Sequence, residues 1–495
     1  MYARLKCRGC AANVARSLQQ ESLRRYIAPG IPNVKVVLIN PYELGRQPFG
    51  LAEPAAWLKR EGCDVRCLDL SLQMLEPEVL AGANLVAIYV AMHTATRIAV
   101  AALPRIKLLA PDAHLCVYGL YAPMNEIMFR KLDVGTVLGG EVEPALVSLV
   151  RRLRTSKPGV QAEPVVSLAK IDFIAPDRSG LPALVRYAHL ITLEGSNKVV
   201  GFAEGSRGCK HLCRHCPVVP VYQGMFRIVR VEVVMADIRQ QVAAGAQHIS
   251  FGDPDFFNGP THAEKLMRAL HAEFPQLTYD ATIKIQHLLE RPDLLTVLKE
   301  TGCLFITSAI ESVDDRILDY LAKHHTNADF GRAVQLVRAA GIALAPTFVP
   351  FTPWTTLEGY IALLARLIEL KLIESVPPIQ LAIRLLVPQG SELLKLPGFM
   401  ENLDAFDPQL LGYPWRNVDA RVDALHKDIQ AWVMDAESRN LARREIFARI
   451  WELAHTAAGL RASSLPEGGS DAPGPRLSEP WYCCAEPTDQ QLQSF

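Results

Sequence analysis

Three cysteines in a CxxxCxxC spacing constrain this chain more than any other feature of its sequence. Cys209, Cys213 and Cys216 lie on a loop that opens with Gly205, follows an apolar run and precedes a long series of alternating strand and helix patterns. This spacing allows three thiolates to bind one inorganic cluster. An iron–sulfur cube normally takes four cysteine ligands, and the loop offers no fourth. We therefore expect one open iron, and we expect the chemistry at that iron.

A structural zinc site is the alternative interpretation of the same loop. Structural zinc takes four ligands in a tetrahedron, and His211 or His215 could supply the fourth. Zinc ribbons and fingers are small modules, whereas a long strand–helix series follows this loop. The cluster is therefore the favoured interpretation.

Residues 205–216 resemble the cluster loop of the radical S-adenosylmethionine (radical SAM) enzymes. In that family three cysteines bind a [4Fe-4S] cluster, and the amino and carboxylate groups of SAM chelate the open iron. The resemblance implies that Cys209, Cys213 and Cys216 are the metal ligands. It also implies [4Fe-4S] and SAM as cofactors, and a partner that donates electrons, such as flavodoxin or ferredoxin.

Composition argues against several other classes of protein. Lys and Arg together number 52, as do Asp and Glu, so no overall positive charge draws the chain to nucleic acid or acidic membranes. No apolar run reaches the length of a membrane span, and no apolar core of a signal peptide follows the N-terminal basic residues. The eleven cysteines are clustered, which indicates reduced metal ligands and reactive thiols and argues against a disulfide framework. We expect a cytoplasmic protein that acts on a small molecule, with no nucleic-acid or membrane partner.

The hydrophobic pattern divides the chain into six parts. They are an N-terminal extension (1–30), a first α/β domain (31–153), a linker (154–195), a barrel (196–400), a helical domain (401–460) and a flexible tail (461–495). In the first domain, apolar runs at 34–40, 64–70, 85–92, 114–121 and 136–138 alternate with helical segments. Such alternation predicts a parallel, doubly wound sheet. Ligands of such sheets bind beyond the carboxyl ends of the strands, and no GxGxxG motif indicates a dinucleotide there.

The first domain, placed directly before the cysteine loop, is similar in architecture to the cobalamin-binding domain of cobalamin-dependent radical SAM enzymes. The DxHxxG motif that supplies a lower axial histidine in many cobalamin proteins is absent, and His93 and His114 are the histidines of the domain. The resemblance implies cobalamin as a third cofactor, with no histidine beneath the cobalt. The alternative is a domain that serves packing alone.

Six further strands are expected in the barrel, at 199–204, 248–253, 278–285, 303–311, 342–351 and 379–387. They predict a partial (β/α)6 barrel, whose chemistry lies at the carboxyl ends of its strands. The family resemblance implies that residues at these ends contact SAM: Asp253 or Asp255 at its ammonium, Lys284 at its ribose or carboxylate, Glu311 through its carboxylate, and His215 against its adenine. Arg384 could face the carboxylate of SAM or of a substrate. The alternative for each is a charge paired for structural reasons.

The tail ends in a pair of adjacent thiols, Cys483 and Cys484. Residues 461–480 contain too little apolar surface to order themselves, and apolar residues at helical spacing precede them. The ending matches radical SAM proteins named for a Cys-Cys-Ala-Glu-Pro tail, and it is similar to the paired-cysteine tail of the radical SAM enzyme of arsinothricin synthesis. The resemblance implies a catalytic role for both thiols.

Three interpretations of function follow. The first is a radical SAM enzyme that transfers a SAM-derived carbon group, 3-amino-3-carboxypropyl or methyl, to a small soft acceptor such as arsenite held by Cys483 and Cys484. The second is a cobalamin-dependent radical SAM methyltransferase of a natural-product pathway. The third is a non-catalytic iron–sulfur protein that senses redox state or metal. Cleavage of SAM on reduction distinguishes the two enzymes from the sensor.

Overall fold

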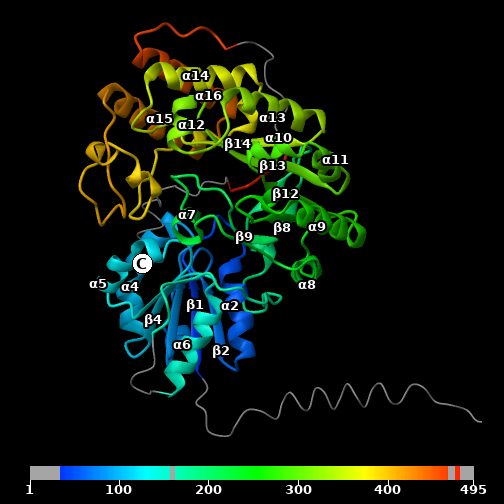
Figure 1. Ribbon diagram of the computed structural model, residues 1–495, viewed down its shortest axis with the longest axis vertical. Helices are drawn as coiled ribbons and strands as arrows, with labels where there is room; N and C mark the ends of the chain where they lie inside the picture. Colours follow the sequence, from blue (N-terminus) through cyan, green and yellow to red (C-terminus); the bar gives the residue numbers. More distant parts are fainter. Residues whose placement is uncertain (1–33, 156–161, 466–473, 480–495) are drawn as a thin grey trace, which may run out of the picture.

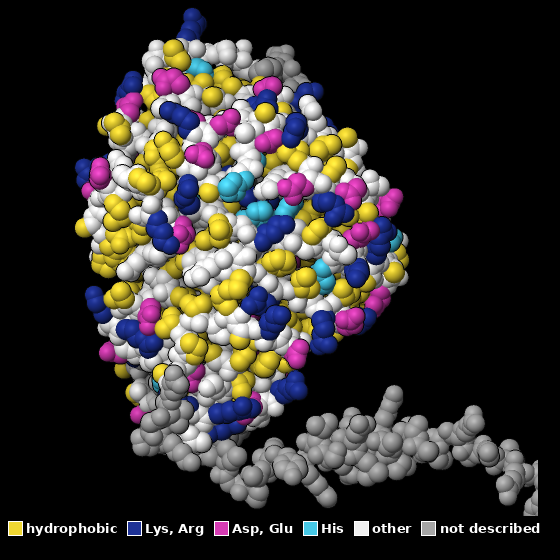
Figure 2. All heavy atoms as spheres, viewed as in Figure 1, with side chains coloured by type: hydrophobic (Ala, Val, Ile, Leu, Met, Phe, Trp, Pro, Cys, Tyr) yellow, Lys and Arg dark blue, Asp and Glu magenta, His cyan; other side chains and the backbone are white. Residues whose placement is uncertain are grey.

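The computed structural model describes residues 34–155, 162–465 and 474–479. Two α/β units lie against each other, the first drawn in blue and cyan and the second in green and yellow, and helices of the C-terminal part cover the far end of the second (Figure 1). Among the described residues, no helix has both the length and the apolar character to cross a membrane. Positive and negative side chains are interspersed over the face shown in Figure 2.

The first unit is a parallel sheet with helices on both faces. Its strands are β1 (Lys35–Asn40), β2 (Asp64–Asp69), β3 (Leu85–Tyr89), β4 (His114–Tyr118), β5 (Thr136–Gly140) and β6 (Val166–Ser167), in the order β2-β1-β3-β4-β5-β6. Helices α2 (Phe49–Arg60) and α6 (Glu143–Thr155) pack on one face, and α4 (His93–Leu109) and α5 (Glu126–Lys131) on the other, with the short α3 (Pro77–Leu80) beside α4. Along β1, Val36 and Leu38 enter one core while Val37 and Ile39 enter the other. Burial of both faces explains why these strands read as continuous apolar runs.

The second unit is a curled half-barrel. Its parallel strands are β8 (Asn197–Ala203), β11 (His248–Phe251), β12 (Thr278–Thr282), β13 (Cys303–Glu311) and β14 (Ala343–Phe348), extended beyond β8 by the antiparallel β7 (His189–Ile191) and β15 (Arg476–Leu477). The helices that alternate with them are α8 (Val231–Ala243), α9 (Pro260–Glu273), α10 (Ile285–Glu290), α11 (Asp293–Glu300), α12 (Asp315–Tyr320), α13 (Asn327–Ala339) and α14 (Leu357–Glu369). A two-stranded sheet of β9 (Ser206–Gly208) and β10 (Phe226–Ile228) flanks α7 (Val218–Tyr222), and α15 (Ala420–Ser438) and α16 (Arg443–Ala457) end the fold.

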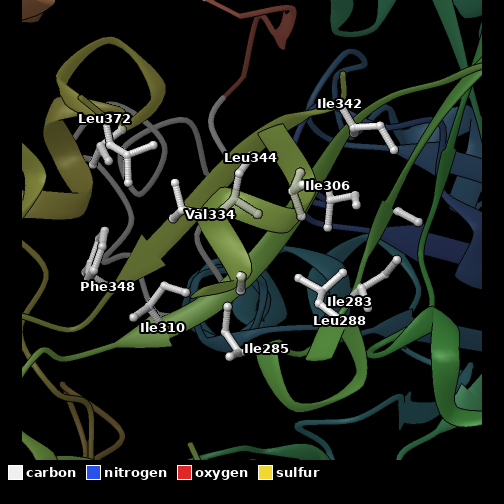
Figure 3. Close-up of a cluster of buried hydrophobic side chains, with 14 of the residues drawn as sticks. Ile283, Ile285, Leu288, Ile306, Ile310, Val334, Ile342, Leu344, Phe348 and Leu372 are labelled. Carbon is white, nitrogen blue, oxygen red and sulfur yellow. The ribbon is translucent and has the colours of Figure 1, made fainter. Parts of the chain in front are cut away.

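Alternation along the barrel strands separates a packed side from a hollow side. Ile306 and Ile310 of β13 pack with Leu344 and Phe348 of β14 and with Val334 of α13 in the outer core (Figure 3). Phe305 and Thr307 of β13 and Ala343, Ala345 and Thr347 of β14 line a cavity instead. Because side chains alternate along a strand, one face of these strands packs in the core and the other face is open to a ligand.

Two expectations from the sequence are corrected by the structure. The sixth barrel strand, expected at 379–387, is absent from the described residues, because Pro377 and Pro378 begin a 3-10 turn (Pro378–Leu381) and only an isolated bridge joins Phe351 to Arg384. Proline lacks the amide hydrogen that a strand ladder requires. The tail is also ordered in part, because Arg476 and Leu477 pair with β7.

Helix α13 illustrates how local sequence fixes an element next to the candidate site. Thr326 accepts a hydrogen bond from the amide of Asp329, and the Asp329 carboxylate accepts one from the amide of Thr326, so the two form a capping box. We expect Thr326→Ala to lower the free energy of unfolding by about 1 kcal/mol, measured by urea denaturation. An unchanged urea midpoint would contradict this role.

Candidate active site

The cysteine loop begins where β8 ends, and an aspartate from the next barrel strand fixes it there. Asp253, just after β11, accepts hydrogen bonds from the Gly205 amide (2.8 Å) and the Ser206 hydroxyl (2.5 Å). A Cβ on Gly205 would stand 3.1 Å from Leu266 and 3.3 Å from Asp253, closer than ordinary contact. Burial raises the pKa of Asp253 to about 6, against the effect of its hydrogen bonds. The predicted SAM contact at Asp253 is therefore a carboxylate already engaged in holding the loop.

The three thiols are held by contacts at both ends of the loop. The Asn258 side-chain oxygen accepts from the Lys210 amide (3.2 Å) and lies 3.7 Å from the Cys209 sulfur. The Cys216 amide donates to the Cys213 carbonyl (3.0 Å), which places these two cysteines in one turn. Cys209 and Cys216 also pack against the same small apolar cluster around α7. Burial raises the pKa of Cys209 to about 11, so iron binding there must displace a proton.

Two buried lysines accompany the thiols. Lys284, at the start of α10, interacts electrostatically with Cys209 and Cys213, and its ammonium has no hydrogen-bond partner. Lys323 interacts electrostatically with Cys213 and Cys216. An unpartnered buried ammonium is costly unless an anion compensates it. Three thiolates around an iron–sulfur cluster would supply that negative charge, so the residues present fit a [4Fe-4S] group.

Glu311 occupies the carboxyl end of β13 in a strained conformation. Its φ of 71° lies in the left-handed region, where the pairing of β13 with β14 also shifts register. Its carboxylate meets His215 at 3.1 Å and the Lys323 ammonium at 3.2 Å. Burial alone would raise the pKa of Glu311, but Lys323 and His215 lower it to about 2. The site therefore keeps an ionised carboxylate beside the thiols, and strained residues of this kind cluster at functional sites.

Asp255 lies between two histidines on the other side of Lys284. Its Oδ2 is 2.7 Å from His287 Nδ1 and 3.3 Å from His211 Nε2. Burial would raise the pKa of Asp255, and the two histidines lower it to about 2. His211 faces Asp255 and His215 faces Glu311. Each histidine of the loop therefore has a carboxylate neighbour from the barrel.

The structure brings most of the predicted residues together, but not all of them. Arg384 contacts Asp423 (2.8 Å) and lies over the Trp415 ring (3.6 Å from its centroid), so the C-terminal part engages it. Cys483 and Cys484 lie outside the described residues. Lys323 and His287 were missed, because neither ends an expected strand. No signal in the sequence indicated Lys323 or His287, because the burial of both side chains appears only in the fold.

Arg207 connects the cysteine loop to the first unit. Its guanidinium is 2.7 Å from Glu143, 3.3 Å from Glu141 and 3.0 Å from Glu204, and it also pairs with Glu53 of α2. One cation cannot neutralise four carboxylates, three of which are buried. Burial therefore raises the pKa of Glu204 and of Glu143, and neighbouring carboxylates add to the effect. Burial also raises the pKa of Glu141 to about 7.

This excess of buried acid predicts a pH-dependent stability. A carboxyl whose pKa is raised on folding keeps its proton longer in the folded state, so stability falls as pH rises from the ordinary value of 4.5 to about 7 for Glu141. We expect Glu141→Gln to remove part of that fall, and to leave the variant more stable than the wild type at pH 8. Urea unfolding at pH 5 and pH 8 measures this, and equal pH slopes for the two proteins would contradict it.

Two cavities lie near the barrel strands, and the smaller of them adjoins the cysteine loop. One, of about 650 Å³, lies in the hollow of the barrel and is of the size that holds small molecules. Residues from several elements line it, among them Arg46, Asp280, Thr307, Thr347 and Leu477. The other, of about 190 Å³, lies between the carboxyl ends of the first sheet and the cysteine loop.

The smaller cavity is where the resemblance implies cobalamin. Its volume is below that of sites for drug-sized ligands, and a corrin is larger than such ligands. The Tyr89 ring fills the space against Gly50, where a Cβ would stand 2.2 Å from the ring. His114 bonds Thr136 at the opposite ends of the strands. The lining residues therefore do not fit a corrin while the two units are docked in this way.

Comparison with known proteins agrees with this geometry. Residues 204–360 match the Radical SAM superfamily, and they include the three cysteines. The ribosomal protein uS12 methylthiotransferase RimO of Geobacter sulfurreducens is 26% identical over 219 residues, which are 39% of this chain and 47% of the relative. The chain thus spans about half the length of this curated relative.

Two solved structures share the fold over more of the chain. The radical SAM methyltransferase TsrM of Kitasatospora setae, with cobalamin and a [4Fe-4S] cluster bound, matches 68% of this chain and 73% of its own at 17% identity, with a TM-score of 0.56. The cobalamin-dependent SAM radical enzyme OxsB, with aqua-cobalamin bound, matches 86% of this chain and 72% of its own at 14% identity, with a TM-score of 0.62. The expected fold class is confirmed. The match to the Radical SAM superfamily covers residues 204–360, and the similar structure of TsrM has a [4Fe-4S] cluster bound.

Proposed function

We propose that this chain is a radical SAM methyltransferase that acts on a small molecule. The observation that carries the proposal is the set of three loop thiols accompanied by two buried lysines at the carboxyl ends of the barrel strands. When bound to Cys209, Cys213 and Cys216, the cluster would pass electrons from a donor such as flavodoxin or ferredoxin to SAM. One SAM would be cleaved to methionine and a 5′-deoxyadenosyl radical that removes a hydrogen atom from the acceptor, and a second SAM would give up its methyl group and leave as S-adenosylhomocysteine. The similarity to TsrM favours methyl over 3-amino-3-carboxypropyl as the transferred group.

The chain's own residues prepare this site in three ways. Lys284 and Lys323 compensate the negative charge of the thiolates. Glu311 remains ionised at neutral pH, so its carboxylate is available to a polar group of SAM. The cavity of about 650 Å³ in the barrel offers space for the acceptor. No step is assigned to cobalamin, because the cavity between the two units does not fit a corrin.

The nucleoside products of SAM test the proposal. Methyl transfer leaves S-adenosylhomocysteine, whereas transfer of the 3-amino-3-carboxypropyl group leaves 5′-methylthioadenosine. Reconstituted enzyme should form S-adenosylhomocysteine under reducing, anaerobic conditions, as mass spectrometry of methyl-labelled SAM would show. Methylthioadenosine as the main product would overturn the proposal. No cleavage by a protein with a full cluster would favour a sensor.

Corrinoid binding can be measured on the same reconstituted enzyme. The docked arrangement predicts that reconstitution with hydroxocobalamin leaves no stoichiometric corrinoid on the protein after desalting. Retention of one corrinoid per chain would mean that the two units separate to admit it, and that cobalamin is the methyl carrier.

A second candidate function rests on the described part of the tail. Residues 474–479 line the larger cavity, and Glu479 contacts Tyr42 of the first unit. Cys483 and Cys484 follow four and five positions later. The last described residues of the tail thus lie beside this cavity. Their position supports the hypothesis that the two thiols hold a soft acceptor such as arsenite. Replacement of both cysteines by serine should then abolish product formation and preserve SAM cleavage, whereas the control Cys67→Ser should change neither.

A further inference from the structure

We propose that His211, Asp255 and His287 form a binding site for a single divalent transition-metal ion, separate from the thiolate ligands. The three side chains come from different elements: His211 from the cysteine loop, Asp255 from the segment after β11, and His287 from α10. One donor atom of each lies within 4.8 Å of the others. This inference does not depend on the proposed methyl transfer.

The three donor atoms are close together, yet they do not bond to one another. His287 Nδ1 is 2.7 Å from Asp255 Oδ2, and His211 Nε2 is 3.3 Å from the same oxygen. All three atoms are buried without a hydrogen-bond partner. Short separations without hydrogen-bond alignment arise when ring nitrogens and a carboxylate oxygen point at a common third position. Ligands about 2.0–2.2 Å from one ion lie no more than about 4.4 Å apart, and the separations of 2.7 Å and 3.3 Å from Asp255 Oδ2 satisfy that limit.

The Asp255 carboxylate is oriented for one-oxygen binding. Its Oδ1 accepts from the amides of Phe257 (3.2 Å) and Lys284 (3.4 Å), which leaves Oδ2 directed toward the histidines. Asp255 and His287 are only 2% and 3% exposed. Hydrogen bonds that fix a ligating group in this way are a regular part of metal sites.

The donor set limits the kind of ion. Two imidazoles and one carboxylate suit zinc or iron(II), whereas an all-oxygen set would suit magnesium or calcium. Three protein ligands leave at least one coordination position open. Lys284 is the nearby cation, and its ammonium is drawn to the Cys213 thiolate as well as to Asp255.

The competing explanation is an ion pair in which Asp255 binds a protonated histidine. Such a pair requires an N–H directed at the carboxylate oxygen, and neither facing ring nitrogen satisfies that condition. The ion pair and the metal site also differ in a measurable way, because only the metal site retains an ion after desalting.

Cobalt(II) binding tests the site in a full-length chain whose loop thiols are replaced. With Cys209, Cys213 and Cys216 changed to alanine, no loop thiolate can bind the probe. We expect one Co²⁺ per chain after desalting, with visible d–d absorption and without the charge-transfer band of a cobalt–thiolate bond. Adding His287→Ala should lower retained cobalt at least tenfold. The matched control His426→Ala removes a buried histidine that bonds the Ala382 carbonyl in the C-terminal part, and it should retain the ion.

Two results would overturn the inference. One is the absence of stoichiometric cobalt in the chain without the three loop thiols while its circular dichroism and unfolding transition match those of the wild type. The other is unchanged cobalt retention in His287→Ala. If that variant fails to fold, His287→Gln replaces it. Cobalt retained by His287→Gln with unaltered d–d bands would also overturn the inference. Loss of methyl transfer with cobalt retained would instead count against the proposed function alone.

Discussion

Cys213→Ala is expected to abolish both the brown iron–sulfur chromophore and all SAM cleavage. Cys213 is the buried thiol of the three, and it is the one that interacts with both Lys284 and Lys323. Two remaining thiolates cannot hold a cube that normally takes four cysteine ligands. The same loss is expected for Cys209→Ala and Cys216→Ala.

Iron and sulfide analysis after anaerobic reconstitution measures this loss, together with the products of SAM. The control is Cys303→Ala, which removes a buried thiol at the start of β13 that bonds only the Phe305 carbonyl. That variant should keep its iron and its activity. A Cys213→Ala protein with full iron content and wild-type turnover would rule out this loop as the cluster site.

Arg207→Gln is expected to lower the free energy of unfolding by about 3–5 kcal/mol at pH 8, because breaking a buried ion pair leaves an uncompensated charge. Here the guanidinium serves four carboxylates from two units, Glu53, Glu141, Glu143 and Glu204. The effect should be smaller at pH 5, where Glu141, with a pKa of about 7, holds its proton.

Urea unfolding followed by tryptophan fluorescence measures the effect. Arg151→Gln is the matched control, since Arg151 pairs with Glu61 at 2.7 Å on the surface with its side chain 65% exposed. Exposed pairs contribute about 0–1 kcal/mol. Equal losses for the two variants would show that Arg207 does not hold the units together.

Much of the fold was predictable because it follows from local pattern. The five main strands of the first sheet and five of the six barrel strands were located by apolar runs, and the cysteine loop by its spacing. The prediction of a sixth strand was wrong because Pro377 and Pro378 begin a 3-10 turn within an apolar run. The short β6 and β7, inside the expected linker, have no periodicity of their own and exist through pairing with β5 and β8.

The candidate site was predictable only where chemistry is visible in the sequence. Asp255 and Glu311 follow strands, so position alone indicated them. Arg207 joins carboxylates as far as 154 positions away, Glu53 among them, and no local pattern indicates such a contact. Lys323 was missed because its role depends on the approach of Glu311 and of the thiols, which only the folded barrel brings together.

Electron paramagnetic resonance of the reduced cluster, with and without SAM, tests the central claim most directly because it requires no acceptor. The claim is that Cys209, Cys213 and Cys216 hold a cluster with one open iron that SAM binds. SAM should change the g-values of the reduced wild-type protein. The same signal before and after addition of SAM, in a protein with a full complement of iron and sulfide, would contradict the account.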